Sequence, residues 1–201
     1  MGRPRAFDED AVLETAMRVF WEKGYEGTSM SDLVTATGLL KGSLYAAFGD
    51  KRSLYRRALA HYDRTLVAAG VAILRGSGSA YERIERFLQS PIDAVARKND
   101  RRGCFLCNAA IDQAVTDPEI GQEVNASINR LEQALHRVLA EGRMGSNGVT
   151  DRARARHLLA VYLGLRVLAR AGQPIETLND VKQSALATAF ACFCLNAWRG
   201  N

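Results

Sequence analysis

The chain has 201 residues, of which 47% are hydrophobic and 24% are charged. This composition is typical of a globular protein and excludes a largely disordered chain. At about 150 residues per domain, the length allows one or two domains. No apolar run approaches the roughly 18 residues of a membrane span, and the opening MGRPRAFDED lacks the apolar core of a signal peptide. We therefore expect a cytoplasmic protein that has no membrane partner.

The formal net charge of +5 favours an anionic partner only if the positive charges are clustered. Between residues 39 and 60 the chain carries five Lys or Arg residues and one acidic residue. Residues 1–38 instead hold four basic and seven acidic residues. The clustering favours a nucleic-acid surface on the segment 39–60.

Glycine and proline divide the chain into segments whose apolar residues follow the helical period, and no long segment alternates as a strand does. We predict an all-α fold of nine helices. They begin near Asp8, Ser29, Gly42, Asp50, Ser79, Gly103, Asp117, Thr150 and Thr177. Pro91 is expected to kink or shorten the fifth helix, and the ninth is expected to end near Trp198.

The fourth helix should run from Asp50 to Gly70 or Gly76 and link two parts of the chain. Its apolar period predicts one inner face, made of Leu54, Ala58, Tyr62, Leu66, Ala69 and Ile73. The first four helices would form a small N-terminal domain and the other five a larger one.

Two short helices, Met30–Thr37 and Gly42–Phe48, are separated by a four-residue turn that opens on Gly38. This arrangement is typical of a helix-turn-helix, whose second helix enters the DNA major groove by its N-terminal end. Lys41 and Ser43 lie at that end and supply a cation and a hydroxyl. From the pattern alone, a simple corner of a helix bundle remains an alternative.

The segments GYEGTSMSDL (24–33) and GLLKGSLYAAFGDK (38–51) closely resemble the DNA-binding domain of TetR-family transcriptional regulators. The resemblance covers residues 6–66, with the helix-turn-helix unit at 29–48. It implies a homodimer that binds a palindromic double-stranded operator, most often as a repressor. It also implies a larger C-terminal domain, residues 77–199, that dimerises and holds a small-molecule effector whose binding releases the DNA.

The resemblance assigns DNA-contact roles to individual positions. Phosphate contacts are expected from Thr28, Ser29, Tyr45 and Lys51, and contacts to base edges from Lys41, Gly42, Ser43, Ala46 and Ala47. Leu44 and Phe48 are expected to be core residues. Leu40 stands where the family often has a small polar residue that caps the recognition helix, so this cap must come from elsewhere.

The segment Gly103–Ala110 resembles a second family pattern, G-C-x-x-x-N, on a helix that borders the effector cavity. By this resemblance the cavity is lined by Phe87, Phe105, Asn108, Ile111, Leu131 and Tyr162. Plain core packing is the alternative for each of these residues. Asn108 is the best single candidate, because an amide on an apolar helix needs a partner.

Cys104 and Cys107 form a C-x-x-C pair, but the βαβ context of a redox enzyme is missing. A zinc site needs four ligands, and the three histidines, His61, His136 and His157, lie far apart in sequence. We therefore expect no metal and no cofactor. A base–nucleophile pair is also missing, so we expect no enzyme activity.

Cys104 is a candidate sensor thiol, which gives an alternative function as a redox- or electrophile-sensing repressor. It is expected in the first turn of a helix, just after Arg101 and Arg102, where positive charge and free N–H groups favour a thiolate. Cys192 and Cys194 lie in an apolar segment and are expected to pack.

The eighth and ninth helices resemble the dimer-forming pair of the family. Their apolar stripes are wider than one buried face needs, which favours a four-helix bundle across a two-fold axis through residues 151–198. A DNA-binding architectural protein without an effector is the remaining alternative.

Overall fold

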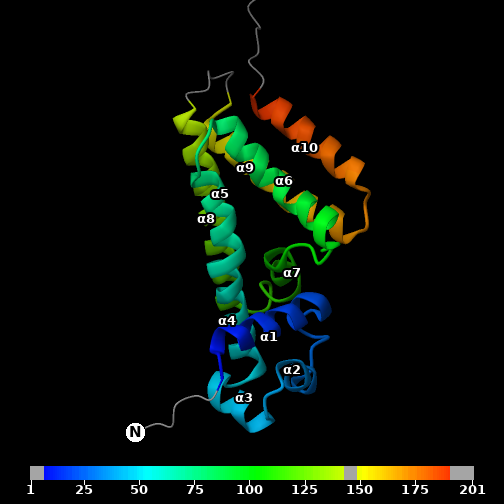
Figure 1. The fold of residues 1–201 in the computed structure, drawn as a ribbon. Coiled ribbons are helices and arrows are strands. Elements are labelled where there is room, and N and C mark those ends of the chain that lie inside the picture. Colours follow the sequence, from blue (N-terminus) through cyan, green and yellow to red (C-terminus); the bar gives the residue numbers. More distant parts are fainter. Residues whose placement is uncertain (1–6, 143–148, 191–201) are drawn as a thin grey trace, which may run out of the picture. The chain divides into compact units, whose positions relative to one another are not determined.

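The computed structural model of the protein describes residues 7–142 and 149–190, and every regular element in these two ranges is a helix (Figure 1). The all-α prediction is therefore confirmed. The pair Cys192 and Cys194 and the predicted helix end at Trp198 lie outside the described residues. The elements are α1 (Glu9–Lys23), α2 (Met30–Thr37), α3 (Lys41–Phe48), α4 (Lys51–Tyr62), the π turn η1 (Asp63–Val67), α5 (Ala68–Arg75), α6 (Ala80–Lys98), α7 (Phe105–Asp112), α8 (Pro118–Glu141), α9 (Asp151–Arg170) and α10 (Ile175–Phe190).

The described residues form two compact units. The N-terminal unit contains the residues up to Ala69 together with Cys104–Ile128, and the C-terminal unit contains Gly70–Gly103 and the residues from Asn129 onward. Two of the three boundaries fall inside α5 and α8, and the third lies between α6 and α7. None of the helices in the described ranges is long and apolar enough to cross a membrane.

The core of the N-terminal unit is built around the packing of α1 against α4. Aromatic side chains fill one end of it. The ring of Phe105, at the start of α7, has its centroid 6.1 Å from that of Trp21, 5.5 Å from that of Tyr55 and 5.8 Å from that of Tyr62. Phe105 is only 1% exposed. These contacts make α7 part of the same core as α1 and α4, although more than 40 residues separate Tyr62 from Phe105 in the chain.

The inner face predicted for the fourth helix is correct only as far as Tyr62. Leu54, Ala58 and Tyr62 are buried, but the face then continues through Val67, Gly70, Val71 and Leu74, whereas Leu66 and Ile73 are partly exposed and Ala69 is exposed. The reason is the π turn over residues 63–67, which holds one residue more than an α-helical turn. Every buried position after it is displaced by one residue.

The helix α6 runs through Pro91 to Lys98, so Pro91 does not shorten it, and the alternative of a kink at Pro91 stays a prediction. Proline lacks the N–H that would bond to the carbonyl four residues earlier. Here the hydroxyl of Ser90 donates to that carbonyl, on Phe87, at 2.8 Å. The preceding serine thus satisfies the acceptor that the proline leaves open.

In the C-terminal unit, α6 packs against α9 and α10, and α9 packs against α10. The amine of Lys182 on α10 is buried and donates to Glu85 at 3.2 Å and to Gln89 at 2.5 Å, both on α6. The last helix starts at Ile175, two residues before the Thr177 start that the capping pattern predicted, because Leu178 N–H already bonds to the carbonyl of Pro174.

Candidate DNA-binding site

The helices α2 and α3 are short because local capping signals begin and end them. Gly38 adopts a left-handed conformation (φ 68°) that ends α2, and its N–H donates to the carbonyl of Val34 at 3.0 Å. Leu33 and Leu44 are completely buried and Phe48 is 4% exposed. The apolar face of each helix therefore points into the N-terminal unit, which leaves the opposite face of α3 at the surface.

The outward face of α3 carries the residues that were expected to meet base edges. Lys41, Gly42, Ser43 and Ala46 are exposed, and Ala47 is half-buried. A side chain built at Gly42 would meet nothing within 4 Å, so the surface of the helix is open here. Tyr45 lies on the same helix and is 41% exposed.

Among the residues that the structure describes, no side chain caps the N-terminus of α3. Its N-cap residue, Leu40, is 79% exposed and supplies no hydrogen bond to the first turn. The first N–H groups of a helix need acceptors from outside the helix, and an anionic group is favoured there by the helix dipole. The N-terminal end of α3, which was predicted to enter the major groove, thus presents backbone N–H donors to an anionic group.

The start of α2 is held by a capping box. Ser29 Oγ accepts from Asp32 N–H at 3.0 Å, and the Asp32 carboxylate accepts from Ser29 N–H at 2.8 Å. Lys23 donates to Asp32 and, with Ser29, holds the pKa of that carboxyl well below its usual range. Thr28 is 1% exposed and its hydroxyl donates to Gly24 O at 2.7 Å. Its placement favours a structural role, and its phosphate contact stays a prediction.

Lys51 is the first residue of α4, directly after the N-cap Asp50. The carboxylate of Asp50 accepts from Ser53 N–H at 2.7 Å, which lowers the pKa of Asp50 and fixes the start of the helix. Lys51 Nζ lies 4.3 Å from the centroid of the Tyr25 ring. A similar but looser contact brings Lys41 Nζ to 5.9 Å from the Tyr45 ring.

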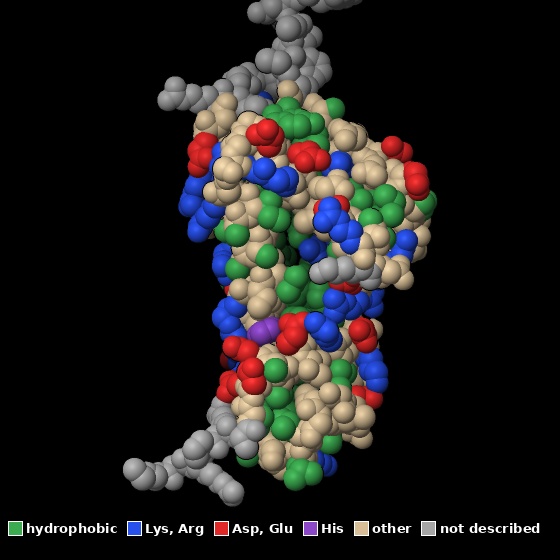
Figure 2. Space-filling model, in the orientation of Figure 1, with side chains coloured by type: hydrophobic (Ala, Val, Ile, Leu, Met, Phe, Trp, Pro, Cys, Tyr) green, Lys and Arg blue, Asp and Glu red, His purple; other side chains and the backbone are tan. Residues whose placement is uncertain are grey.

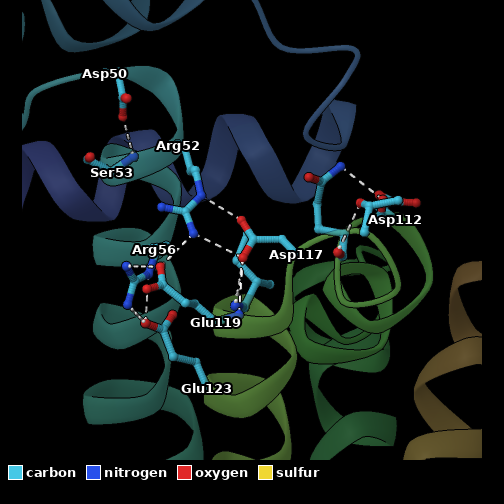
Figure 3. Close-up of polar contacts among 11 residues, drawn as sticks. Asp50, Arg52, Ser53, Arg56, Asp112, Asp117, Glu119 and Glu123 are labelled. Carbon is cyan, nitrogen blue, oxygen red and sulfur yellow. Dashed lines mark hydrogen bonds and ion pairs between the residues drawn. The ribbon is translucent and has the colours of Figure 1, made fainter.

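Three of the five cations counted between residues 39 and 60 are paired with carboxylates inside the N-terminal unit. Arg52 donates two hydrogen bonds to Asp117, at 2.6 and 3.0 Å, and a third to Glu119 at 2.6 Å. Arg56 joins Glu119 at 2.8 Å and Glu123 at 2.5 Å (Figure 3). We call these five residues the arginine–carboxylate ladder.

The third paired cation, Arg57, contacts Glu9. The prediction that the whole segment supplies positive field to DNA is therefore too broad, because only Lys41 and Lys51 have no carboxylate partner within the described part of the chain. The surface over α2 and α3 is correspondingly poor in charge on the face shown in Figure 2.

The effector candidates divide between the two units. In the C-terminal unit, the ring of Phe87 is stacked on that of Tyr162 with centroids 4.1 Å apart. Both Phe87 and Leu131 are buried, and a side chain built at Gly70 would come within 3.2 Å of Phe87 and 3.4 Å of Leu131. Arg166 donates to the Tyr162 hydroxyl at 2.7 Å. Phe87 and Leu131 thus lie beside Gly70, and Tyr162 stacks on Phe87.

The other three effector candidates belong to the N-terminal unit. Phe105 is in the aromatic core described above. The side-chain amide of Asn108 lies 3.5 Å from Trp21 O, and Ile111 is 77% exposed. The assignment of these six residues to an effector cavity stays a prediction.

Cys104 is placed differently from the expectation that it lies inside a helical turn. It is the N-cap of α7, with extended backbone (φ −117°, ψ 121°), and it is only 3% exposed. The Tyr62 hydroxyl points to its sulfur at 3.8 Å. Cys107 is half-buried. Within residues 7–142 and 149–190 no group of His, Cys, Asp and Glu side chains is arranged to hold a metal.

Sequence reasoning missed Tyr25 and the acidic residues of the ladder. A signal for the ladder was present, since Glu119 and Glu123 are spaced by four, as are Arg52 and Arg56. Four-residue spacing places each pair on one helix face. Only the tertiary structure shows that the two faces meet.

Comparison with known proteins agrees with this geometry. The model described as "Bacterial regulatory proteins, tetR family" matches residues 12–58, and that described as "Tetracyclin repressor-like, C-terminal domain" matches residues 80–184. The chain is 33% identical over 184 residues to the uncharacterized HTH-type transcriptional regulator YezE of Bacillus subtilis, with 90% of this chain and 95% of that protein covered. It is 28% identical over 190 residues to the HTH-type transcriptional repressor ComR of Escherichia coli, with 92% and 90% covered.

A solved structure of the TetR-family regulator CifR is similar over nearly the whole chain. It is a cysteine mutant in complex with a 26-base-pair double-stranded operator DNA. The TM-score is 0.77 at 34% sequence identity, with 92% of this chain and 98% of that chain covered. The two family models match separate parts of this chain, and the relatives YezE and ComR match 90% and 92% of it. The chain therefore belongs to the TetR family of bacterial transcriptional regulators.

Proposed function

We propose that the protein is a ligand-responsive repressor that binds a palindromic operator as a homodimer and is released by a small-molecule effector. The observation that carries this proposal is the outward face of α3, where Lys41, Gly42 and Ser43 lie exposed at an uncapped helix N-terminus. The complex of CifR with operator DNA supports DNA binding by this chain. Such a regulator meets its operator in the cytoplasm, and we propose no enzymatic activity.

In this proposal, residues 6–66 form the DNA-binding domain and α3 enters the major groove. Lys41 and Ser43 supply the hydrogen bonds to base edges, and Ala46 supplies an apolar contact suited to a thymine methyl group. Tyr45 and Lys51 bind phosphates and thereby fix the register of the protein on the duplex. Arg52, Arg56 and Arg57 are already paired with carboxylates. We therefore expect phosphate contacts from few side chains, chiefly Tyr45 and Lys51.

Residues 77–199 would hold the effector and form the dimer. An effector can shift the DNA-binding equilibrium by no more than its difference in affinity for the two states. We favour a small-molecule effector over a thiol switch at Cys104, because Cys104 is only 3% exposed and a buried thiol is poorly accessible to an electrophile.

The experiment is a footprint on the DNA that flanks the protein's own gene, repeated with candidate effectors and across salt concentrations. We expect a protected palindrome, loss of protection with one effector, and altered base preference for Lys41→Ala and Ser43→Ala. Lys51→Ala should weaken binding equally across sequences and lower the salt slope by about one. Arg97→Ala, an exposed cation on α6 of the other unit, is the matched control and should leave both quantities unchanged. Binding that is indifferent to sequence would refute the repressor and favour an architectural protein.

A further inference from the structure

The side chain of Lys51 lies over an aromatic ring whose position is fixed by local structure. Tyr25 belongs to the turn between α1 and α2, which starts at Gly24 with φ 74°. In this turn Thr28 N–H donates to Tyr25 O at 3.2 Å, and the Thr28 hydroxyl donates to Gly24 O at 2.7 Å. The backbone of Tyr25 is therefore held by hydrogen bonds on both sides of the residue.

The ring of Tyr25 is also fixed from behind by the core. It meets the ring of Tyr55 edge to face, with centroids 4.9 Å apart, and lies nearly parallel to the ring of Phe20 at 6.2 Å. Tyr55 is 1% exposed and Phe20 is fully buried, so neither ring can move without disturbing the core. Burial raises the pKa of the Tyr25 hydroxyl above its usual value.

Lys51 brings a long, flexible side chain to this ring. Its backbone is fixed at the start of α4 by the Asp50 cap, but a free lysine side chain samples many rotamers and loses that freedom when it binds a phosphate. An ammonium 4.3 Å from a ring centroid is within the range of a cation–π contact. One side of the ammonium faces the ring, and its other N–H donors stay available.

We propose that Tyr25 is a positioning residue for DNA binding: its ring holds the Lys51 ammonium in place for an operator phosphate. The proposal rests on the proposed function, in which Lys51 is a phosphate contact. In this role the face of the Tyr25 ring contacts the ammonium, and the Tyr25 hydroxyl is not required.

The first test is a double-mutant cycle on operator affinity with Tyr25→Leu, Lys51→Ala and the double variant. We expect Tyr25→Leu to weaken binding about 2- to 10-fold, the range expected when one rotamer-rich side chain must be ordered on binding, and to have no further effect once Lys51 is Ala. Tyr25→Phe keeps the ring and should bind like the unmodified protein. An equal loss from Tyr25→Leu in both Lys51 backgrounds would mean that the ring acts only through the fold, and would overturn the proposal.

A second test does not depend on whether Tyr25→Leu folds. Phenylalanine analogues with one, two and three ring fluorines are placed at position 25 of the full chain. Fluorination weakens the negative ring face with little change in shape, so operator affinity should fall stepwise with each fluorine. In the Lys51→Ala background the series should be flat. Unchanged affinity across the series with Lys51 present would overturn the positioning role, whereas failure of the unmodified protein to bind any operator would instead refute the proposed function.

Discussion

Replacing Phe105 by alanine should destabilise the N-terminal unit more than any change at the surface of α7. The side chain is 1% exposed and lies within 6.1 Å, centroid to centroid, of three other aromatic rings. Truncation of a buried phenylalanine costs about 3–5 kcal/mol, and each lost aromatic pair is part of that cost at about 0.5–1.5 kcal/mol. For a chain of this length the melting temperature should fall by roughly 6–20 °C, at about 2–4 °C per kcal/mol.

The measurement is urea and thermal unfolding followed by circular dichroism at one protein concentration, since a dimer's stability depends on concentration. Ile111→Ala is the matched control, because Ile111 lies on the same helix and is 77% exposed. It should change the free energy of unfolding by less than about 0.5 kcal/mol. If Phe105→Ala cost under about 1 kcal/mol, or no more than Ile111→Ala, α7 would not belong to the core of the N-terminal unit.

The remaining predictions concern acid, assembly and thiol reactivity. Arg52 lowers the pKa of Asp117 from 3.8 to about 2, so the stabilisation from this pair is complete above pH 4 and is lost as the pH falls through 2. Asp117→Asn should therefore flatten the dependence of the urea midpoint on pH between 4 and 2, and an unchanged acid slope would contradict the pairing. Residues 151–198 should form a stable dimer, and sedimentation that finds only a 22.0 kDa species at micromolar concentration would exclude it. Iodoacetamide should label half-buried Cys107 before Cys104, whereas the reverse order together with operator release would favour the thiol-sensing alternative.

The helix-turn-helix could be predicted from the sequence because its signals are local. Ser29 and Asp50 accept hydrogen bonds from backbone N–H groups three residues ahead, and Gly38 ends α2 in a left-handed conformation. Each signal acts within one turn of the chain, so the sequence next to it contains the information. The predicted burial of Leu44 and Phe48 is also confirmed.

What could not be predicted depends on contacts distant in the chain. From the sequence, Arg52 is predicted to be a cation that faces DNA. The structure shows that it is paired with Asp117, which lies 65 residues away in the chain. Counting the Lys and Arg residues of a segment therefore overestimates the charge available to DNA wherever carboxylates on another helix pair with those residues.

The π turn at residues 63–67 also bears on how the length of this chain can change. A π turn equals an α-helical turn with one inserted residue, so the buried positions after it, such as Gly70 and Leu74, follow the helical period of α4 once that residue is left out of the count. Deleting Thr65, which is exposed, would turn the segment into regular α-helix without rotating either flank. The same deletion a few residues away, within α4 or α5, would turn the downstream face by about 100° and expose the core. In this helix, the position of a one-residue deletion decides whether the fold tolerates it.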